Sequence, residues 1–203
     1  MENKEMKAQM EKTEIVNTNE KANTAATAEE KHLEFFGLPL TGIITDFKAA
    51  LKGQMLKENP FAVWIPEEPL CDLEERLTYS NGNEEHENDF FAGAKARMEI
   101  FYTNRTWTVY GVRVTLERSS EFADQDEMRH EYEQLLQEKY EGRSRITSRA
   151  IKFLELTIYD GAPQGPGLGT VLIEPAADGD GVSITYYDRA NRELDREARR
   201  NDL

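Results

Sequence analysis

The side chains best suited to metal binding or nucleophilic catalysis are few and scattered. His32, His86 and His130 lie far apart in the sequence, and none has a second His or a Cys at the spacing of a metal site. The single cysteine, Cys71, excludes an internal disulfide. Acidic residues surround it and disfavour the thiolate that would act as a nucleophile. We therefore predict no metal site and no cysteine nucleophile.

Two glycine-containing stretches share features with ligand-binding loops without meeting their requirements. Residues 161–169 are rich in glycine but lead into a predicted strand, whereas a phosphate-binding loop leads into the N-terminus of a helix. Residues 178–181 follow part of a calcium-loop pattern, but the third acidic position and the distal glutamate are missing. We expect a flexible hairpin loop and a tight turn, and we assign no cofactor-binding residue.

Carboxylates are too numerous to identify a catalytic pair. The chain has 39 Asp and Glu residues, so closeness in sequence does not distinguish one pair from another. A carboxylate dyad in a cleft, as in glycosidases, stays open as an alternative. No catalytic residue is assigned.

The features that remain favour binding. Residues 67–89 contain nine acidic residues and one basic residue, a local charge of −8. We expect an exposed excursion there, which either steers a basic partner or only adds solubility. Aromatic residues are enriched in interfaces, although most of those in this chain are expected to fill the core. The candidate interaction surface combines two tryptophans with the end of the acidic segment: Trp64, Trp107, Glu84, Glu85, Glu87 and Asp89.

Composition excludes several classes of function. The 203 residues carry a net charge of −14, which argues against a general nucleic-acid binder and against docking on anionic membranes. No apolar run is long enough for a transmembrane helix, and the polar N-terminus lacks the apolar region of a secretory signal. We expect a soluble, cytoplasmic protein without a cofactor, with an unidentified protein as its partner.

The chain divides by composition near Lys31. Residues 1–30 have no aromatic residue and one β-branched aliphatic pair, so they cannot bury enough apolar surface to fold. We predict a disordered tail, with a transient helix near its start as the alternative. Residues 31–203 are predicted to form a single domain, which could be read as two halves, 31–118 and 119–203.

In the first half, the spacing of apolar residues predicts a short helix followed by strands. Thr45 can cap a helix whose apolar residues recur at helical spacing, ending at Met55. A short strand is expected at 61–65 and another at 77–79. Alternation of apolar and polar residues over 94–102 and 110–117 predicts an antiparallel hairpin in which each strand has one buried face.

The second half repeats this order. A helix is predicted from Asp124 or Asp126 to about Tyr140, and glycine follows it. Its apolar stripe consists of Met128, Tyr132, Leu135, Leu136 and Tyr140. Three strands are expected at 150–159, 169–174 and 182–187, followed by a solvated helix over 190–203. A helix followed by antiparallel strands, in each half, predicts an α+β fold with helices packed on one face of an antiparallel sheet. A pseudo-repeat of helix plus strands stays open as an alternative.

Several short motifs together resemble a group of small uncharacterised proteins from Bacteroides and relatives. The opening Phe36-Gly37-Leu38-Pro39-Leu40-Thr41-Gly42 carries much of this likeness. The other motifs are Phe90-Phe91-Ala92-Gly93, the helix residues Lys139-Tyr140, and Tyr186-Tyr187-Asp188-Arg189-Ala190-Asn191. The resemblance spans about Leu33 to the C-terminus and implies no activity or catalytic residue. Many members of that group have a signal peptide before the opening, and this sequence departs from them there.

The leading hypothesis is a non-enzymatic protein-interaction module. One alternative is a hydrolytic enzyme with a carboxylate pair in a cleft between the halves. Another is an acidic decoy or chaperone for basic partners. The enzyme requires a pocket with two carboxylates, the module a shallow apolar patch, and the decoy clustered surface carboxylates whose binding is lost in salt.

Overall fold

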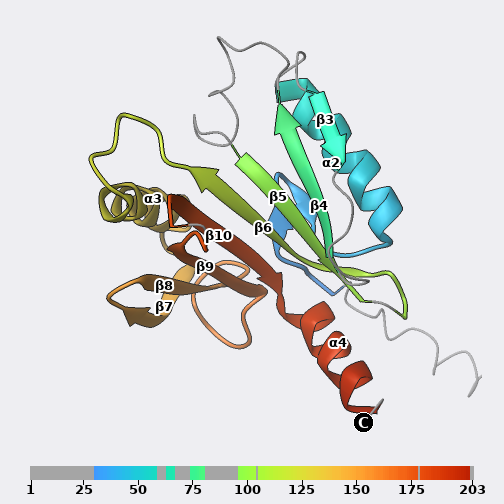
Figure 1. Ribbon diagram of the computed structural model, residues 1–203. Coiled ribbons are helices and arrows are strands. Elements are labelled where there is room, and N and C mark those ends of the chain that lie inside the picture. The colour runs from blue at the N-terminus through green and yellow to red at the C-terminus, as the bar shows by residue number, and fades with distance from the viewer. Residues whose placement is uncertain are drawn as a thin grey trace, which may run out of the picture. The chain divides into compact units, whose positions relative to one another are not determined.

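An eight-stranded antiparallel sheet forms the scaffold of the protein in a computed structural model (Figure 1). The structure describes residues 30–58, 63–66, 74–80, 96–103, 105–177 and 179–201. Lys31–Leu203 form one compact unit. Residues 1–29 of the predicted tail and most of the acidic segment therefore lie outside the described residues, as do Cys71 and His86.

The strands follow the order β3-β4-β5-β6-β10-β9-β8-β7 across the sheet. They are Val63–Pro66 (β3), Glu74–Ser80 (β4), Ala96–Tyr102 (β5), Val109–Glu117 (β6), Ser144–Ala150 (β7), Phe153–Ile158 (β8), Gly169–Pro175 (β9) and Gly181–Asp188 (β10). A separate two-stranded hairpin pairs Glu34–Phe35 (β1) with Leu38–Pro39 (β2). The predicted α+β class with an antiparallel sheet is confirmed.

Each half of the sheet follows one helix. Helix α2 (Ile44–Glu58) precedes β3 to β6, and helix α3 (Gln125–Lys139) precedes β7 to β10. In both halves, strands that follow one another in sequence pair antiparallel. The last strands of the two sets, β6 and β10, pair at the centre of the sheet. The repeated order of helix and strands predicted from the sequence is therefore present.

One face of the sheet is apolar and is covered by α2 and α3. Alternate residues of the central strands point into this layer, including Val114 of β6 and Ile184 of β10, which are register partners. Phe47 and Leu51 of α2 and Leu136 of α3 belong to the same buried cluster. Burying these side chains removes apolar surface from water, which is the main force that holds the two helices on the sheet.

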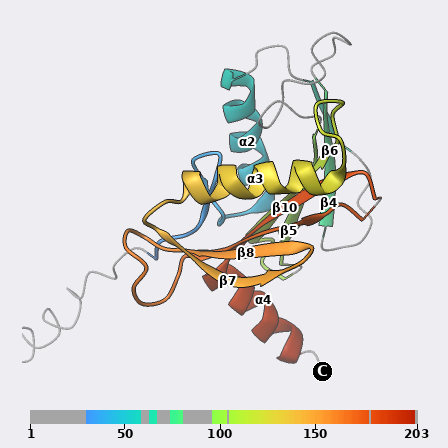
Figure 2. The same ribbon diagram turned by 90° about the vertical axis from the view of Figure 1, so that its left-hand side faces the viewer.

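Helix α4 (Arg189–Asn201) lies on the other side of the sheet from α3 (Figure 2). It makes contacts with β6, β9 and β10. Its residue Arg192 places its guanidinium carbon 4.0 Å from the ring centre of Tyr187, which alternates along β10 with the core residue Tyr186. The terminal helix predicted over 190–203 therefore exists, and it contacts the opposite face of the sheet.

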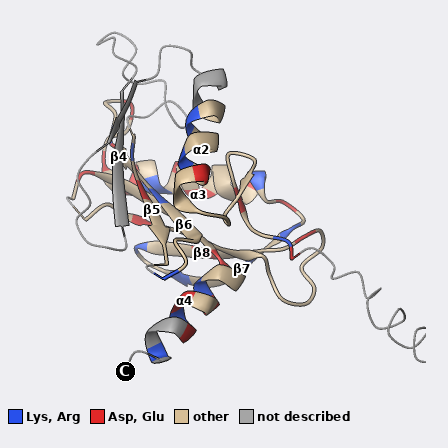
Figure 3. Cartoon of the chain, turned by 90° about the vertical axis from the view of Figure 1, so that its right-hand side faces the viewer, with Lys and Arg blue, Asp and Glu red and all other residues tan. Residues whose placement is uncertain are grey.

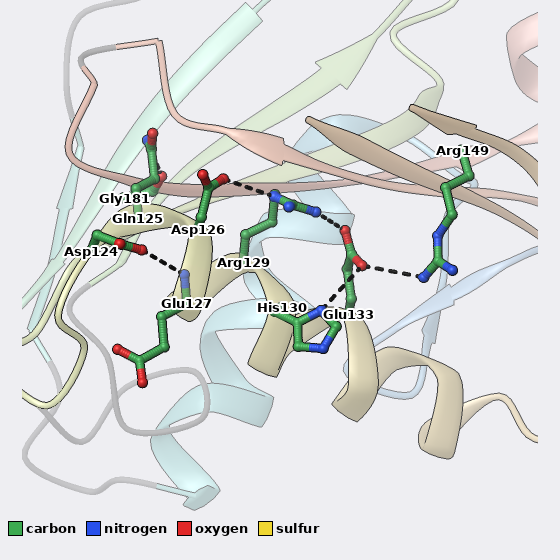
Figure 4. Close-up of polar contacts among 9 residues, drawn as sticks. All are labelled: Asp124, Gln125, Asp126, Glu127, Arg129, His130, Glu133, Arg149 and Gly181. Atoms are coloured by element: carbon green, nitrogen blue, oxygen red, sulfur yellow. Dashed lines mark hydrogen bonds and ion pairs between the residues drawn. The ribbon is translucent and has the colours of Figure 1, made fainter. Parts of the chain in front are cut away.

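Helix α3 begins where the sequence predicts. Asp124 is the N-cap, and its carboxylate accepts a hydrogen bond of 2.8 Å from the backbone N–H of Glu127 (Figure 4). The carboxylate of Glu127 in turn accepts from the backbone N–H of Ala123 at 2.6 Å. The first bond satisfies one of the backbone donors that the first turn of a helix leaves without partners, and the second ties the residue before the N-cap to the helix.

One member of the predicted apolar stripe of α3 is wrongly assigned. Leu135 is 43% exposed, whereas Leu136 is 5% exposed and belongs to the core. The buried position beside Leu136 is taken by Glu133, whose carboxylate binds the guanidinium groups of Arg129 and Arg149 (Figure 4). A charged side chain is buried only when it is paired, and the spacing of apolar residues does not show such pairs. The spacing therefore could not show that Glu133, and not Leu135, lies on the buried side of the helix.

Two predictions about the strands also require correction. The sequence predicted three strands after α3, but there are four, because residues 150–159 were taken as one strand and β7 was missed. In addition, β5 and β6 are not buried on one face only. Glu99 and Phe101 of β5 are buried on the face opposite the core, where Arg113 of β6 pairs with Glu99 and lies over the Phe101 ring.

Candidate functional site

Of the predicted interaction residues, Trp107 is the one whose side chain the structure describes. Trp64 lies in β3, for which only the backbone is described. Four residues lie outside the described residues: Glu84, Glu85, Glu87 and Asp89. The predicted combination of tryptophans with acidic side chains therefore stays a prediction, and the surface around Trp107 can be followed residue by residue.

Trp107 sits in the turn between β5 and β6 with an unusual backbone conformation. Its φ is +58°, in the left-handed region that non-glycine residues rarely adopt. Its side chain is 55% exposed. Residues held in such conformations cluster at binding and active sites because the rest of the fold must keep them there.

Backbone hydrogen bonds hold Trp107 in this conformation on both sides. Its N–H donates to the carbonyl oxygen of Thr103 at 2.8 Å, and its carbonyl oxygen accepts from the N–H of Ile44 at 2.9 Å. The hydroxyl groups of Thr103 and Thr106 lie 2.5 Å apart, and that of Thr106 lies 2.8 Å from the Thr108 hydroxyl. The turn is therefore a fixed platform for the indole ring.

The indole ring packs on one neighbour and leaves much of its surface open. It stacks on Tyr102, with ring centres 5.9 Å apart and an interplanar angle of 19°. Ile43 is 52% exposed, and its backbone forms an isolated bridge with Thr108, the residue after Trp107. We call Trp107 and Ile43 the Trp107 patch.

A second surface lies on the sheet face opposite the core and was not predicted. Thr157 of β8 pairs in register with Thr170 of β9, which pairs with Tyr187 of β10. These three side chains form the floor of a cleft of about 210 Å³. The predicted hairpin loop contributes Gly167 to the lining, and β9 contributes Gly169. We call this site the arginine cleft because three arginines of α4 line its other side.

That wall is formed by one side of α4. Arg189, Arg192, Glu193 and Arg196 line the cleft. Figure 3 shows Lys and Arg residues spaced along α4. Arg189 is occupied within the protein, since its Nε donates to the Gly167 carbonyl oxygen at 2.8 Å and its guanidinium lies 3.3 Å from the Glu193 carboxylate. The other two arginines lie three and seven residues after Arg189, on the same side of the helix.

A buried polar joint fixes where α4 begins. Asp188 is fully buried, and its two carboxylate oxygens accept from the backbone N–H groups of Asn191 and Leu33, each at 2.9 Å. The Asn191 side-chain amide donates to the Leu40 carbonyl oxygen at 2.9 Å. His32 adds its Nδ1 at 3.2 Å from Asp188. These contacts tie the start of α4 to the β1–β2 region and set the direction in which its arginines point.

Tyrosines on the core face have raised pKa values because they are buried. Burial raises the pKa of Tyr140 to about 12, with Arg143 opposing and Glu34 adding to the shift. Burial also raises the pKa of Tyr186, to which Tyr140 adds. Their hydroxyl groups therefore stay neutral at and well above neutral pH, because burial disfavours the charged phenolate.

The described residues bear on the alternatives left open by the sequence. They contain no group of three or more His, Cys, Asp or Glu side chains arranged to hold a metal ion. The arginine cleft is lined by one carboxylate, that of Glu193, and lacks the carboxylate pair that the hydrolytic alternative needs. No helix within the described part of the chain is long and apolar enough to cross a membrane.

Sequence reasoning missed the arginine cleft because it considered the glycine-rich stretch only together with the strand that follows it. The α4 N-terminus in fact lies against this loop, where the Arg189 N–H donates to the Leu168 carbonyl oxygen at 2.9 Å. The spacing of three arginines near the C-terminus was the available signal.

No protein-family model matches the sequence, and no curated protein or solved structure matches it either.

Proposed function

We propose that this chain is a non-enzymatic protein-interaction module that docks on its partner through the Trp107 patch. The observation that carries the proposal is the exposure of a tryptophan whose strained backbone is held by hydrogen bonds on both sides. Tryptophan is one of the three residue types enriched among the side chains that dominate binding energy. The proposal retains the sequence-based expectations of a cytoplasmic protein related to the Bacteroides group, which implies no activity.

The fixed backbone supports binding because it lowers the entropy lost when the partner arrives. A large aromatic side chain on a mobile loop has to be ordered during association, at a cost of about 0.5–1.5 kcal/mol per side chain. Here the Thr103, Thr106 and Thr108 contacts already hold the turn, and Tyr102 supports one face of the indole ring. The open face can then enter an apolar pocket of a partner.

The net charge indicates the chemistry of that partner. A chain of charge −14 attracts a basic surface at long range and repels an acidic one. We therefore propose a partner with an apolar pocket surrounded by basic residues. The pocket supplies affinity for Trp107, and the charges mainly raise the association rate.

Comparative capture from native lysate tests this proposal. Bait proteins are the wild type, Trp107→Gly, and the control Ile151→Ala, which truncates a fully exposed apolar residue in the β7–β8 turn. We expect proteins captured by the wild type and by Ile151→Ala to be lost with Trp107→Gly at low and at moderate salt. Captured proteins that persist with Trp107→Gly but disappear in salt would contradict docking through the patch and favour the acidic-decoy alternative.

A further inference from the structure

We propose that the arginine cleft is a binding site for a phosphate monoester dianion, the terminal group of a phosphorylated ligand. This site lies on a different part of the sheet from the Trp107 patch, and the proposal does not depend on that patch. It rests on the donors that line the cleft, on its size and on what already occupies each donor.

The first observation is that two guanidinium groups line the cleft without a carboxylate as ion-pair partner. Among the described residues, Arg192 and Arg196 form no ion pair, although the sequence contains 39 acidic residues. Arg192 instead lies over the Tyr187 ring, which orients the guanidinium without neutralising its charge. Glu193, the one carboxylate of the lining, is 3.3 Å from Arg189. Positive charge is therefore left for a ligand.

The second observation is that the floor adds a neutral donor. Thr170 lies between Thr157 and Tyr187 in one register row, at the bottom of the cleft. The Thr157 hydroxyl is engaged by the Thr147 hydroxyl from the edge strand β7. Thr170 makes no side-chain hydrogen bond to other described residues. Its hydroxyl group can therefore donate to a bound anion.

The arrangement of donors favours a tetrahedral anion over a carboxylate. A carboxylate has two oxygens in one plane and satisfies one guanidinium in a bidentate pair. Two guanidinium groups from α4 and the Thr170 hydroxyl from the floor approach from different sides, and a phosphate group offers three strong acceptor oxygens with a charge of about −1.5 to −2 at neutral pH. Arg is the side chain that best matches phosphate geometry.

The size of the cleft limits the ligand. Its volume of about 210 Å³ is smaller than that of sites for drug-sized molecules, so it holds a compact anionic group and leaves the rest of the ligand outside. Neither glycine of the lining leaves room for a side chain. A Cβ at Gly167 would overlap the Thr157 methyl group, and one at Gly169 would overlap the Tyr187 carbonyl group.

The test is an NMR titration of the full chain with inorganic phosphate at constant ionic strength. We expect saturable shifts of the backbone amides of Gly167, Gly169 and Thr170. Arg192→Gln and Arg196→Gln should each weaken the affinity about tenfold, as loss of a charge-assisted contact does. Arg200→Gln, a change of an exposed arginine on α4 outside the cleft, should leave the affinity within about twofold.

Further titrations compare phosphate with other ligands, and a further variant tests the floor of the cleft. Acetate should cause much smaller shifts than phosphate, and equal shifts would overturn the preference for a tetrahedral dianion. Phosphoserine peptides and nucleoside monophosphates then distinguish a phosphorylated protein from a small molecule, and tighter binding of either than of phosphate supports the site. Thr170→Val, which keeps the shape of the floor, should weaken binding without loss of folding. Shifts that do not saturate, or that are unchanged in both glutamine variants, would overturn the proposal.

Discussion

Two neighbouring rows of residues run across the same strands and face opposite sides of the sheet. The first row contains Ile100, Val112, Tyr186, Val171 and Leu156, which are cross-strand partners and are all buried. The second row is displaced by one residue along each strand and contains Phe101, Gly111, Tyr187, Thr170 and Thr157. Apolar side chains fill the first row, whereas the second changes from aromatic rings to hydroxyl groups.

The difference between the rows shows how one sheet can serve both stability and binding. Apolar residues in the first row attach α2 and α3, and their exchange for polar residues would expose the whole layer. In the second row, the rings of Phe101 and Tyr187 lie 5.7 Å apart over Gly111, and the threonines at its far end remain half-buried beside α4. The row opposite the core thus carries groups that can bind a ligand without weakening the core.

The largest expected effect comes from Leu136, which packs α3 against the core face of the sheet. Leu136→Ala should lower the free energy of unfolding by about 2–5 kcal/mol, because it leaves a cavity between α3 and the sheet. Leu135→Ala, its neighbour with 43% exposure, should change it by less than about 0.5 kcal/mol. Urea titrations of both variants measure this contrast. Equal losses would mean that the buried side of α3 is misassigned.

A second effect on the core face depends on pH. The pKa of Tyr140 is about 12 in the folded chain against 10.0 for an unperturbed tyrosine. The stabilising contribution of its neutral hydroxyl is therefore complete below pH 10 and is lost as the pH rises toward 12. The loss amounts to about 2–3 kcal/mol. The free energy of unfolding, measured by urea titration from pH 9 to about pH 12, should fall less for Tyr140→Phe than for the wild type. An equal fall with pH for the two proteins would contradict the raised pKa.

In the row opposite the core, the test is whether Gly111 is required by the rings stacked above it. A Cβ at Gly111 would lie 2.7 Å from the Tyr186 carbonyl oxygen and 2.9 Å from Tyr187 Cδ1. Gly111→Ala should therefore lower stability by about 1–3 kcal/mol through overpacking. The control is Gly53→Ala in α2, where nothing lies within 4 Å of the added Cβ. Thermal melts of the two variants should move in opposite directions, since alanine favours a helix.

The smallest effect concerns the backbone of Trp107. Glycine adopts a φ of +58° without the steric cost that an L-residue meets there. Trp107→Gly should therefore be more stable than Trp107→Ala by about 0.5–1 kcal/mol, since both variants lose the stacking on Tyr102. Denaturant midpoints of the two variants provide the measurement. A more stable alanine variant would show that the turn is not strained.

Alternation of apolar residues was sufficient to predict the fold class and the β5–β6 hairpin, and Asp124 was one of two residues at which α3 was expected to start. Alternation failed for β7, whose residues are half-buried or exposed because it is an edge strand, and whose pairing with β8 is interrupted between Ile146 and Ser148. It also failed for Glu133, because one of its two partners, Arg149, lies in β7.

The candidate sites could be predicted only in part. Composition indicated Trp107 as a candidate interaction residue, but the hydrogen bond from Ile44 that holds its left-handed conformation joins residues distant in sequence. The arginine cleft depends on cross-strand register and on the joint at Asp188 that directs α4. Neither the register nor this joint can be predicted from the local spacing of residues. The arginines were therefore interpreted as part of a solvated helix.

The most direct test of the central claim is the affinity for the partner recovered by capture with the wild type. Isothermal titration calorimetry would compare the wild type with Trp107→Gly and with the control Ile151→Ala. If Trp107 anchors the interface, Trp107→Gly should weaken binding about 30-fold or more, and Ile151→Ala should leave it unchanged. Equal affinities for all three proteins would contradict the claim that the chain docks through the Trp107 patch.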